Sequence, residues 1–445
     1  MRGWPFPIWL AHTLACLAAG WLPFHAGAQS LSREQVIAQM HPYTGPHVAG
    51  VDTSTLTGKV MCGYQGWFAA PGDGAEEGWV HYGPNTPAFG PGTCYFDLWP
   101  DVSELGPDEK FPTPFRHRDG RVAYVFSPCV PRTVRRHFEW MRDYGIDGVF
   151  LQRFGADLKW PPGLRHNNLV TANVQAGANA CGRTWAVMYD LSGLHAGEVR
   201  PWVIDDWKRL VDRMQVTRDP AYLHHHGRPV VAVWGIGFND GRQYTLAECA
   251  ELVRFLKSDP HYGGNTVMLG LPAFWRTAER DAFTDPRFME IVRQADIISP
   301  WEVGRYHDDA SARQHIVKQT VPDMAWCRTN GKDFLPVIFP GFSWHNLMKA
   351  RGKAAPTEAM PRHGGQYLWT QAAANCAVGA SMIYVAMFDE LDEGTAIFKC
   401  TDDPPVGASP FVALKGPSDQ YLWLTGQIGK MLRREIPATD VMPGR

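Results

Sequence analysis

The chain repeats one pattern of hydrophobic and polar positions: a short apolar run, a polar or aromatic tip, and then a stretch with the apolar spacing of a helix. The apolar runs predict strands at 59–67, 123–126, 147–154, 184–190, 229–234, 266–270, 296–301, 334–340 and 382–387. The amphipathic stretches predict helices at 131–144, 202–214, 246–257, 286–294 and 421–435. Strands that alternate with helices pair in parallel through right-handed crossovers.

About eight such units in one chain predict an α/β fold, a single (β/α)8 barrel of the TIM type with long loops. An open doubly wound sheet would more often carry a glycine-rich phosphate turn after its first strand, and Gly63-Tyr64-Gln65-Gly66 does not match that motif. The segment 69–120, which is rich in Gly and Pro, is expected to be a long insertion that forms one wall of a cleft. The helix at 421–435 is expected to close the outside of the barrel.

The N-terminal residues have the pattern of an export signal. Arg2 precedes an apolar stretch, and Ala26-Gly27-Ala28 supplies the small residues of a cleavage site. We therefore expect a signal peptide at 1–28, cleavage near Ala28, one domain at 29–445, and a secreted or periplasmic protein. Pro5, Pro7 and Pro23 interrupt the segment, which argues against a membrane anchor, and we expect no membrane span later in the chain.

Composition narrows the class of partner. The formal net charge is −2 and Lys and Arg are dispersed, so neither nucleic acid nor an anionic membrane is expected as a partner. The chain contains 18 tryptophans, and aromatic faces beyond those that fill a core would suit the C–H faces of sugar rings. For any single tryptophan, a place in the core is the simpler interpretation. We expect a monomer.

Cysteine and histidine do not indicate a metal site. All nine cysteines except Cys16 lie beyond the signal segment, and an even number in an exported chain permits disulfides. Their wide spacing and apolar neighbours suit buried free thiols equally well. Adjacent side chains in a loop point in different directions, so His224, His225 and His226 are expected at the surface rather than around a metal. No metal and no cofactor are expected.

The most informative motif is Asp389-Glu390-Leu391-Asp392-Glu393, which directly follows the predicted strand at 382–387. Carboxylates that repel one another raise one another's pKa values, which keeps one acid protonated beside an ionised one. Most glycosidases use such a pair. The alternatives are a solvated acidic loop or the first turn of a following helix, although no helical pattern follows.

Further candidates come from the strand tips, because active residues of a barrel lie where the strands end. Together the tips supply aromatic platforms, carboxylates, an arginine and an amide, which suits an oligosaccharide or polysaccharide substrate. The predicted substrate-binding residues are Tyr64, Gln65, Trp67, Arg153, Tyr189, Asp190, Trp234, Trp301, Glu302, Trp344, His345, Asp389 and Asp392.

The region from 364 to 395 resembles the end of the glycoside hydrolase family 99 barrel, where a helix and the last strand lead into an Asn-Glu-Trp-His-Glu-Gly-Thr motif. The corresponding residues here are Asp389-Glu390-Leu391-Asp392-Glu393-Gly394-Thr395. Weaker similarities lie at Tyr64 and at 141–149, 227–229 and 339–342, and together they suit bacterial sequences called glycoside hydrolase family 71/99-like. Asp389, Leu391 and Asp392 depart from the family motif, so the mannosidase substrate of family 99 is not implied.

The resemblance implies catalytic roles for two residues. Glu393 would be the general acid and Glu390 the base. In that family the base deprotonates the 2-hydroxyl of the sugar, and a 1,2-anhydro sugar forms.

The residues alone leave the route open. Their spacing does not separate attack by water, with inversion, from attack by an internal hydroxyl, with retention. Two other hypotheses also stand: a non-catalytic carbohydrate-binding barrel, and a Ca²⁺ site that uses Asp389 and Asp392.

Overall fold

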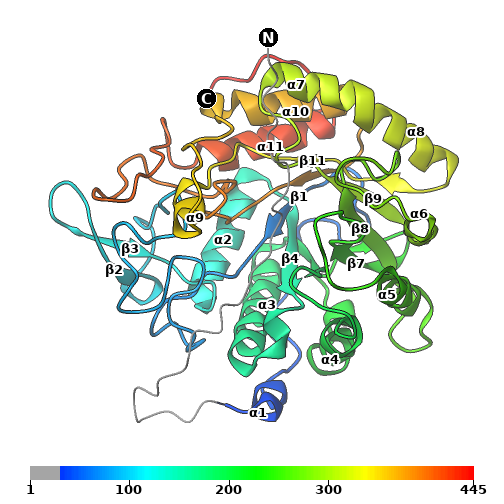
Figure 1. The fold of residues 1–445 in the computed structure, drawn as a ribbon, viewed down its shortest axis with the longest axis horizontal. Coiled ribbons are helices and arrows are strands. Elements are labelled where there is room, and N and C mark those ends of the chain that lie inside the picture. Colours follow the sequence, from blue (N-terminus) through cyan, green and yellow to red (C-terminus); the bar gives the residue numbers. More distant parts are fainter. Residues whose placement is uncertain (1–30) are drawn as a thin grey trace.

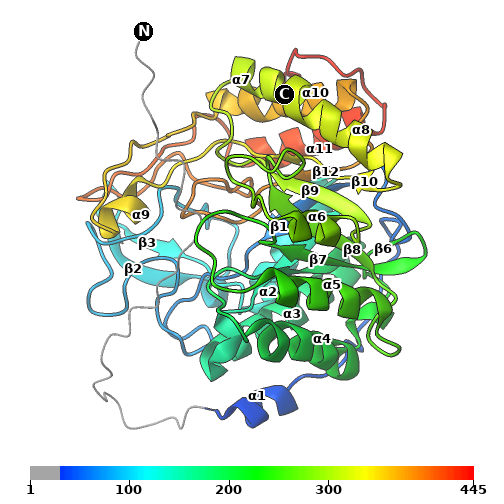
Figure 2. The same ribbon diagram turned by 45° about the vertical axis from the view of Figure 1, so that its right-hand side comes forward.

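The structure is a computed structural model that describes residues 31–445. The predicted signal peptide at 1–28 lies outside the described residues. Figures 1 and 2 show the strands at the centre, the helices around them, and the small hairpin of β2 and β3 set to one side. Buried hydrophobic side chains form one continuous cluster that runs through the sheet and the helix layer.

The central sheet is built from parallel pairings of the predicted strands. Its members are β1 (Val60–Tyr64), β4 (Gly148–Phe154), β5 (Thr184–Asp190), β7 (Arg228–Trp234), β8 (Thr266–Pro272), β9 (Ile297–Trp301), β10 (Asp333–Phe334), β11 (Val337–Ile338) and β12 (Ile383–Val385). Almost every residue in these strands is buried, as expected for a sheet that is covered on both faces.

The sheet closes on itself through one segment of the chain. The strand order β10-β9-β8-β7-β5-β4-β1-β12-β11 begins and ends with β10 and β11, which are the two halves of the predicted strand at 334–340. Leu335 N donates to Ile298 O of β9 at 2.9 Å, and Tyr384 N of β12 donates to Pro336 O at 3.0 Å. A single segment therefore bridges both edges, and the predicted (β/α)8 barrel is confirmed.

Helices connect the strands and form the outer ring. Those of the ring are α2 (Pro131–Tyr144), α3 (Pro161–Cys181), α4 (Asp205–Arg209) with π-helical turns on both sides, α5 (Leu246–Ser258), α6 (Pro286–Val292), α7 (Asp309–His315), α8 (Val321–Thr329), α10 (Gln366–Ala377) and α11 (Gln420–Leu432). Two short helices, α1 (Arg33–Ala38) and α9 (His345–Ala350), lie in the N-terminal segment and after β11. The predicted C-terminal helix is α11, which contacts α2, α10 and β1.

The predicted strand at 123–126 is not part of the barrel. It forms β3 (Val122–Val125), which pairs antiparallel with β2 (Phe111–Arg116) inside the long insertion. Proline at 112 and 114 hides β2 from a search for apolar runs, although Thr113 and Phe115 are buried on one face. The insertion is thus partly ordered by its own hairpin.

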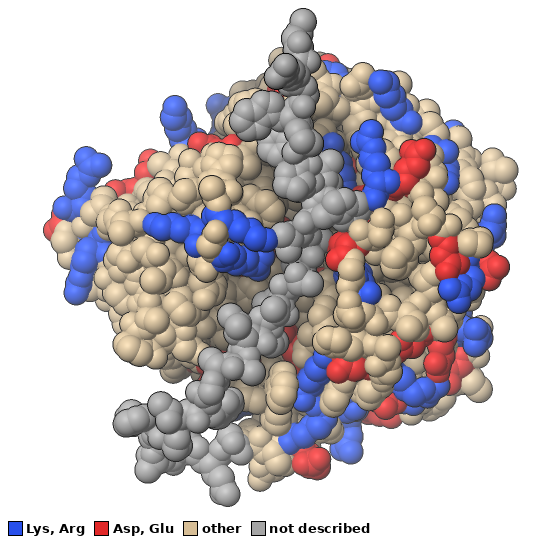
Figure 3. Space-filling view, in the orientation of Figure 1, with Lys and Arg blue, Asp and Glu red and all other residues tan. Residues whose placement is uncertain are grey.

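The described cysteines form no disulfides, and charged residues are dispersed over the visible surface (Figure 3). All eight cysteines of residues 31–445 are free thiols, and seven are buried. Of the two interpretations of their spacing, disulfides or buried free thiols, the structure supports buried free thiols. Figure 3 shows basic and acidic side chains scattered over the visible face and separated by other residues. None of the described helices combines the length and the apolar character needed to cross a membrane.

Candidate active site

Residues 389–395, called here the acid turn, follow β12 at the carboxyl edge of the barrel. Asp389, Glu390, Asp392 and Glu393 are 0%, 2%, 4% and 9% exposed, so the turn is not a solvated acidic loop. The residues directly after the acid turn are not helical, so the acids do not form the first turn of a following helix. Gly394 closes the turn with φ 64°, and a Cβ there would lie 2.8 Å from the backbone N and O of Ser343.

Asp389 fixes the acid turn to the end of β1, the strand that pairs with β12. Its two carboxylate oxygens accept the backbone N–H groups of Gln65 at 2.7 Å and Gly66 at 2.9 Å. Burial raises the pKa of Asp389 to about 7, although both backbone donors favour the ionised form. These two hydrogen bonds hold the carboxylate of Asp389 against the backbone at the end of β1.

Glu390 is held by two donors. Its Oε1 accepts from Gln65 Nε2 at 2.8 Å, and its Oε2 accepts from the hydroxyl of Thr395. Burial raises the pKa of Glu390 well above its ordinary value, and the charges of Glu393 and Asp392 raise it further. The negative charge of Glu393 therefore opposes ionisation of Glu390.

Glu393 is the most exposed of the four acids. Its backbone carbonyl accepts from Ser343 N at 2.9 Å, which ties the acid turn to the segment after β11. Its charge is the largest of the electrostatic contributions to the raised pKa of Glu390. Its side chain therefore lies near Glu390, and it is the least buried of the four acids.

Asp392 binds a residue that the sequence did not identify. His81 comes from the long insertion, and its Nδ1 lies 2.8 Å from Asp392 Oδ2. The His81 ring stacks on Trp67 with centroids 3.8 Å apart and planes 6° apart. One face of Trp67 is thus covered by protein, and the insertion contributes His81 directly to the surroundings of the acid turn.

Four buried polar atoms around the acid turn have no hydrogen-bond partner in the described protein. They are Gln65 Oε1, Trp67 Nε1, Gln152 Oε1 and Asp392 Oδ1. Buried polar groups are normally satisfied, so these atoms are suited to a ligand or water that supplies several hydroxyl groups. The four atoms comprise three acceptors and one donor.

A chain of hydrogen bonds supports the end of β1 from the insertion side. Gly66 O accepts from His166 Nε2 at 2.6 Å, and His166 Nδ1 lies 2.9 Å from Glu77 Oε2. Cys129 Sγ is 3.6 Å from the same Nδ1. The histidine contacts the thiol and the carboxylate through one nitrogen only, so this group is not arranged as a nucleophile with its base.

Three predicted residues face the helix layer instead of the barrel mouth. Arg153 is fully buried and binds Asp206 through Nε and Nη2 at 2.9 and 2.8 Å, and the Tyr189 hydroxyl donates to Asp206 at 2.8 Å. The Tyr64 hydroxyl lies 2.8 Å from His137 Nδ1 on α2. Successive side chains of a strand point to opposite faces, so Gln152 occupies the inward position beside Arg153.

A second group of predicted residues lies at the ends of β5, β7 and β9. Asp190 Oδ1 accepts from Ser192 N at 2.7 Å, and the Ser192 hydroxyl accepts from Arg242 at 2.9 Å. The Arg242 guanidinium lies 4.9 Å from the ring centre of Trp234. Trp234 in turn meets Trp301 edge to face at 5.4 Å. These side chains form one packed group at the carboxyl edge.

The remaining predicted residues have partners of their own. Glu302 forms an ion pair with His315 of α7 at 2.7 Å. His345 Nδ1 lies 2.6 Å from Ala355 O, and His345 N donates to Asp97. Trp344 meets Phe342 edge to face and is half-buried. The structure thus brings Gln65, Trp67 and the acid turn together most closely.

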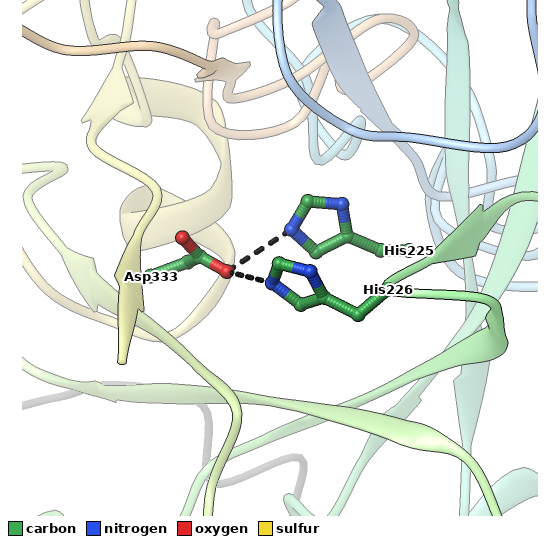
Figure 4. A group of neighbouring side chains, drawn as sticks. All are labelled: His225, His226 and Asp333. Carbon is green, nitrogen blue, oxygen red and sulfur yellow. Dashed lines mark hydrogen bonds and ion pairs between the residues drawn. The ribbon is translucent and has the colours of Figure 1, made fainter. Parts of the chain in front are cut away.

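The expectation that the three histidines diverge is wrong for two of them. Figure 4 shows His225 and His226 converging on Asp333, whose Oδ2 lies 3.0 and 2.6 Å from their Nε2 atoms. This is the one group of His, Cys, Asp and Glu within residues 31–445 whose ligand atoms gather as at a metal site. It lies where β6 (His224–His225) pairs with the start of β7, at the opposite end of the barrel from the acid turn.

The hydrogen bonds of this group do not fit a metal. Leu56 N donates to His225 Nδ1 at 3.1 Å, so the proton of the neutral ring lies on Nε2, which donates to Asp333. A metal would need the lone pair of that nitrogen. The group is a hydrogen-bonded clamp that ties the segment before β1 to β6 and β10.

The closed parallel barrel with buried carboxylates at its carboxyl edge places the chain in the class of (β/α)8 proteins. Its fold is like that of glycoside hydrolase family 99. The endo-α-mannosidase of that family from Bacteroides thetaiotaomicron has a TM-score of 0.58 and 16% identity, over 85% of this chain and 99% of that chain. The complex of that enzyme with Bis-Tris propane has a TM-score of 0.59 and 16% identity, over 86% of this chain and 99% of that chain.

A glycoside hydrolase-like protein is similar as well, with a TM-score of 0.51 and 12% identity, over 89% of this chain and 99% of that chain. No protein-family profile matches the chain. No curated protein matches it in sequence. The resemblance to family 99 is confirmed at the level of the fold.

Proposed function

We propose that the protein is an exported glycoside hydrolase that cleaves glycosidic bonds in an oligosaccharide or polysaccharide. One observation carries this proposal: Glu390, with its raised pKa, lies beside Glu393 at the carboxyl edge of the barrel. The unpartnered polar atoms around the pair supply sites for sugar hydroxyls. The similar folds of glycoside hydrolases support the same class of reaction.

Glu390 is assigned as the base and Glu393 as the general acid. Both oxygens of Glu390 accept hydrogen bonds, from Gln65 and Thr395, and such donors favour a carboxylate. Its raised pKa makes that carboxylate a stronger base. Glu393 is more exposed, and it is therefore better placed to protonate the oxygen that leaves with the remainder of the glycan.

The finer route follows the family 99 pattern. Glu390 removes the proton of the sugar 2-hydroxyl, whose oxygen attacks the anomeric carbon while the leaving oxygen takes the proton of Glu393. Water then opens the 1,2-anhydro sugar, and the two carboxyl groups return to their first states. Direct attack by water activated by Glu390 is the alternative, and the configuration of the first product separates the two routes.

The substrate is proposed only as a class. The name endo-α-mannosidase belongs to the structural neighbour. Three motif positions differ here, and Asp392 is bound to His81 of the insertion. The sugar that meets the acid turn is therefore expected to differ from that of the neighbour.

A screen of plant and microbial glycans with detection of new reducing ends tests the proposal. The wild-type protein should release reducing sugar from at least one glycan, and Glu390→Gln should lower that rate by about 10²- to 10⁴-fold. Glu290→Gln, an exposed change on α6, is the matched control and should keep the full rate. Binding of a glycan without any release of reducing ends would favour the non-catalytic carbohydrate-binding barrel instead.

A further inference from the structure

We propose that Trp160 is a platform on which a distal sugar residue stacks, so that the site takes a saccharide chain that extends beyond the acid turn. This inference rests on the proposed saccharide-directed function and adds a binding subsite to it. The ring that carries the inference is the most exposed of the tryptophans in residues 31–445, with 63% of its surface accessible.

Trp160 is more exposed than the other described tryptophans. Nine of the described tryptophans are buried, among them Trp67 and Trp234, and the other large hydrophobic residues that are strongly exposed are all valines. Most of the described tryptophans therefore pack in the core. Trp160 is the exception, and its open ring is available to a ligand in a way that the covered ring of Trp67 is not.

Its place in the fold puts it on the catalytic side. Trp160 lies in the loop between β4 and α3, after the carboxyl end of the strand. Since β12, β1 and β4 are successive parallel neighbours, this loop and the acid turn share one edge of the barrel. A chain leaving the acid turn over β1 would meet the β4 loop next.

Contacts link this loop to the acid turn. Trp160 N donates to Asp157 O at 3.3 Å, which closes the short turn of 157–159. Burial raises the pKa of Asp157 to about 6, and the charge of His81 opposes that rise, so Asp157 and His81 lie close to each other. His81 is the partner of Asp392. The ring of Phe154 at the end of β4 also lies 5.1 Å from Trp67, which stacks on His81, so the loop after β4 starts beside the acid turn.

Ion pairs of neighbouring residues hold the loop that carries Trp160. Lys159 pairs with Glu198 from the loop after β5, and Arg165 of α3 lies 3.1 Å from Glu76 of the insertion. These ion pairs anchor the chain before and after Trp160, so the backbone that carries the ring is fixed on both sides. An exposed aromatic ring on a loop that also carries Lys159 suits a sugar, which has an apolar C–H face and polar hydroxyls, better than a purely apolar partner.

Affinity gel electrophoresis tests the platform without depending on turnover. Glu390→Gln serves as the background, and gels contain α-mannan, β-1,3-glucan, xylan or dextran. At least one polysaccharide should retard the background protein, and adding Trp160→Ala should weaken that affinity about tenfold, with Trp160→Phe in between. Val317→Ala, an equally exposed residue on the outer helices, is the matched control and should not change the retardation.

Equal retardation of the background protein and of its Trp160→Ala variant, both folded by circular dichroism, would overturn the platform. Absence of retardation of the background protein in all four gels would overturn it as well. Neither result depends on hydrolysis. A protein that binds glycan through Trp160 but releases no reducing ends would refute the hydrolase proposal alone, so the two failures are distinguishable.

Discussion

Asp392, which is paired with His81, is one of the two acids whose charges act on Glu390. Asp392 lies within the acid turn, and its negative charge raises the pKa of Glu390. Its contact with His81, at 2.8 Å, ties that charge to a residue of the insertion. The protonation of the proposed base is therefore linked to the insertion through His81.

Replacing Asp392 by Asn should shift the acidic limb of the pH–activity curve to lower pH. The base must be ionised to act, Asp392 opposes its ionisation, and the neutral amide removes that opposition. The pH dependence of kcat/KM on the identified glycan measures the shift. Asp403→Asn, at an exposed site, is the control. A shift of the alkaline limb alone would mean that Glu390 acts as the acid, and that the two roles must be exchanged.

Side-chain alternation explains which site residues the sequence predicted well. The acid turn, Gln65 and Trp67 were predicted from their place after apolar runs, and the structure groups them. The same reasoning does not tell inward from outward positions at a strand end, so Arg153 was chosen where Gln152 faces the mouth. His81 could not be predicted, because its contact with Asp392 spans most of the chain and follows no local pattern.

At the scale of elements, Arg153 and Asp206 join β4 to α4 through a fully buried ion pair. Loss of Arg153 would leave the buried Asp206 with only Tyr189 and the more distant Arg209 as partners, so Arg153→Met should destabilise the protein by about 3 kcal/mol. Urea unfolding measures the loss. Arg153→Met combined with Asp206→Leu should recover much of it, and a single variant as stable as the wild type would contradict a structural role for the pair.

The clamp of His225, His226 and Asp333 gives a second prediction for elements. The hydrogen bond from His225 holds the pKa of Asp333 below its ordinary value of 3.8, so its ionised form stabilises the fold. That contribution is present above the unfolded pKa and is lost as the pH falls through the lower folded pKa. The stability difference between wild type and Asp333→Asn, measured by urea unfolding, should therefore be largest near neutrality and shrink below pH 3.8.

A difference that stayed constant down to the lowest pH would contradict the clamp. Addition of Zn²⁺ should leave the melting temperature of the wild type unchanged, because the hydrogen bonds of His225 leave no lone pair for a metal. Stabilisation by Zn²⁺ that disappears in Asp333→Asn would reverse that conclusion.

The predicted boundaries of an element agree with the observed ones where a single apolar run forms a single strand. β5 occupies 184–190 as predicted, and α11 begins and ends within a few residues of the predicted helix. The run at 334–340 is divided at Leu335 and Pro336, because one half pairs with β9 and the other with β12. Closure of the sheet decides that division, and a local pattern cannot encode it.

For the whole molecule, export remains a prediction from the first 28 residues. The intact mass of the mature protein should correspond to cleavage near Ala28, and the protein should be found outside the cytoplasm. Mass spectrometry of the secreted or periplasmic fraction measures it. A mature chain that retains Met1 and stays in the cytoplasm would refute the signal peptide without affecting the barrel.

The same scale shows why the fold was easier to predict than the site. Each repeat of a strand and a helix independently indicates a barrel. The prediction that 123–126 is a barrel strand was wrong, but the other repeats still specified the architecture. The site depends on a few contacts between distant segments. Each of these contacts, such as Asp389 with the end of β1, is formed only when the barrel has closed.

The most direct test of the central claim compares the two glutamates on substrates with different leaving groups. Glu393→Gln should lose most activity on the natural glycan yet keep a large part on an aryl glycoside with an acidic phenol, which leaves without protonation. Glu390→Gln should lose activity on both by about 10²-fold or more. Two folded variants that hydrolyse both substrates at the wild-type rate would contradict the proposal that these carboxylates perform the reaction.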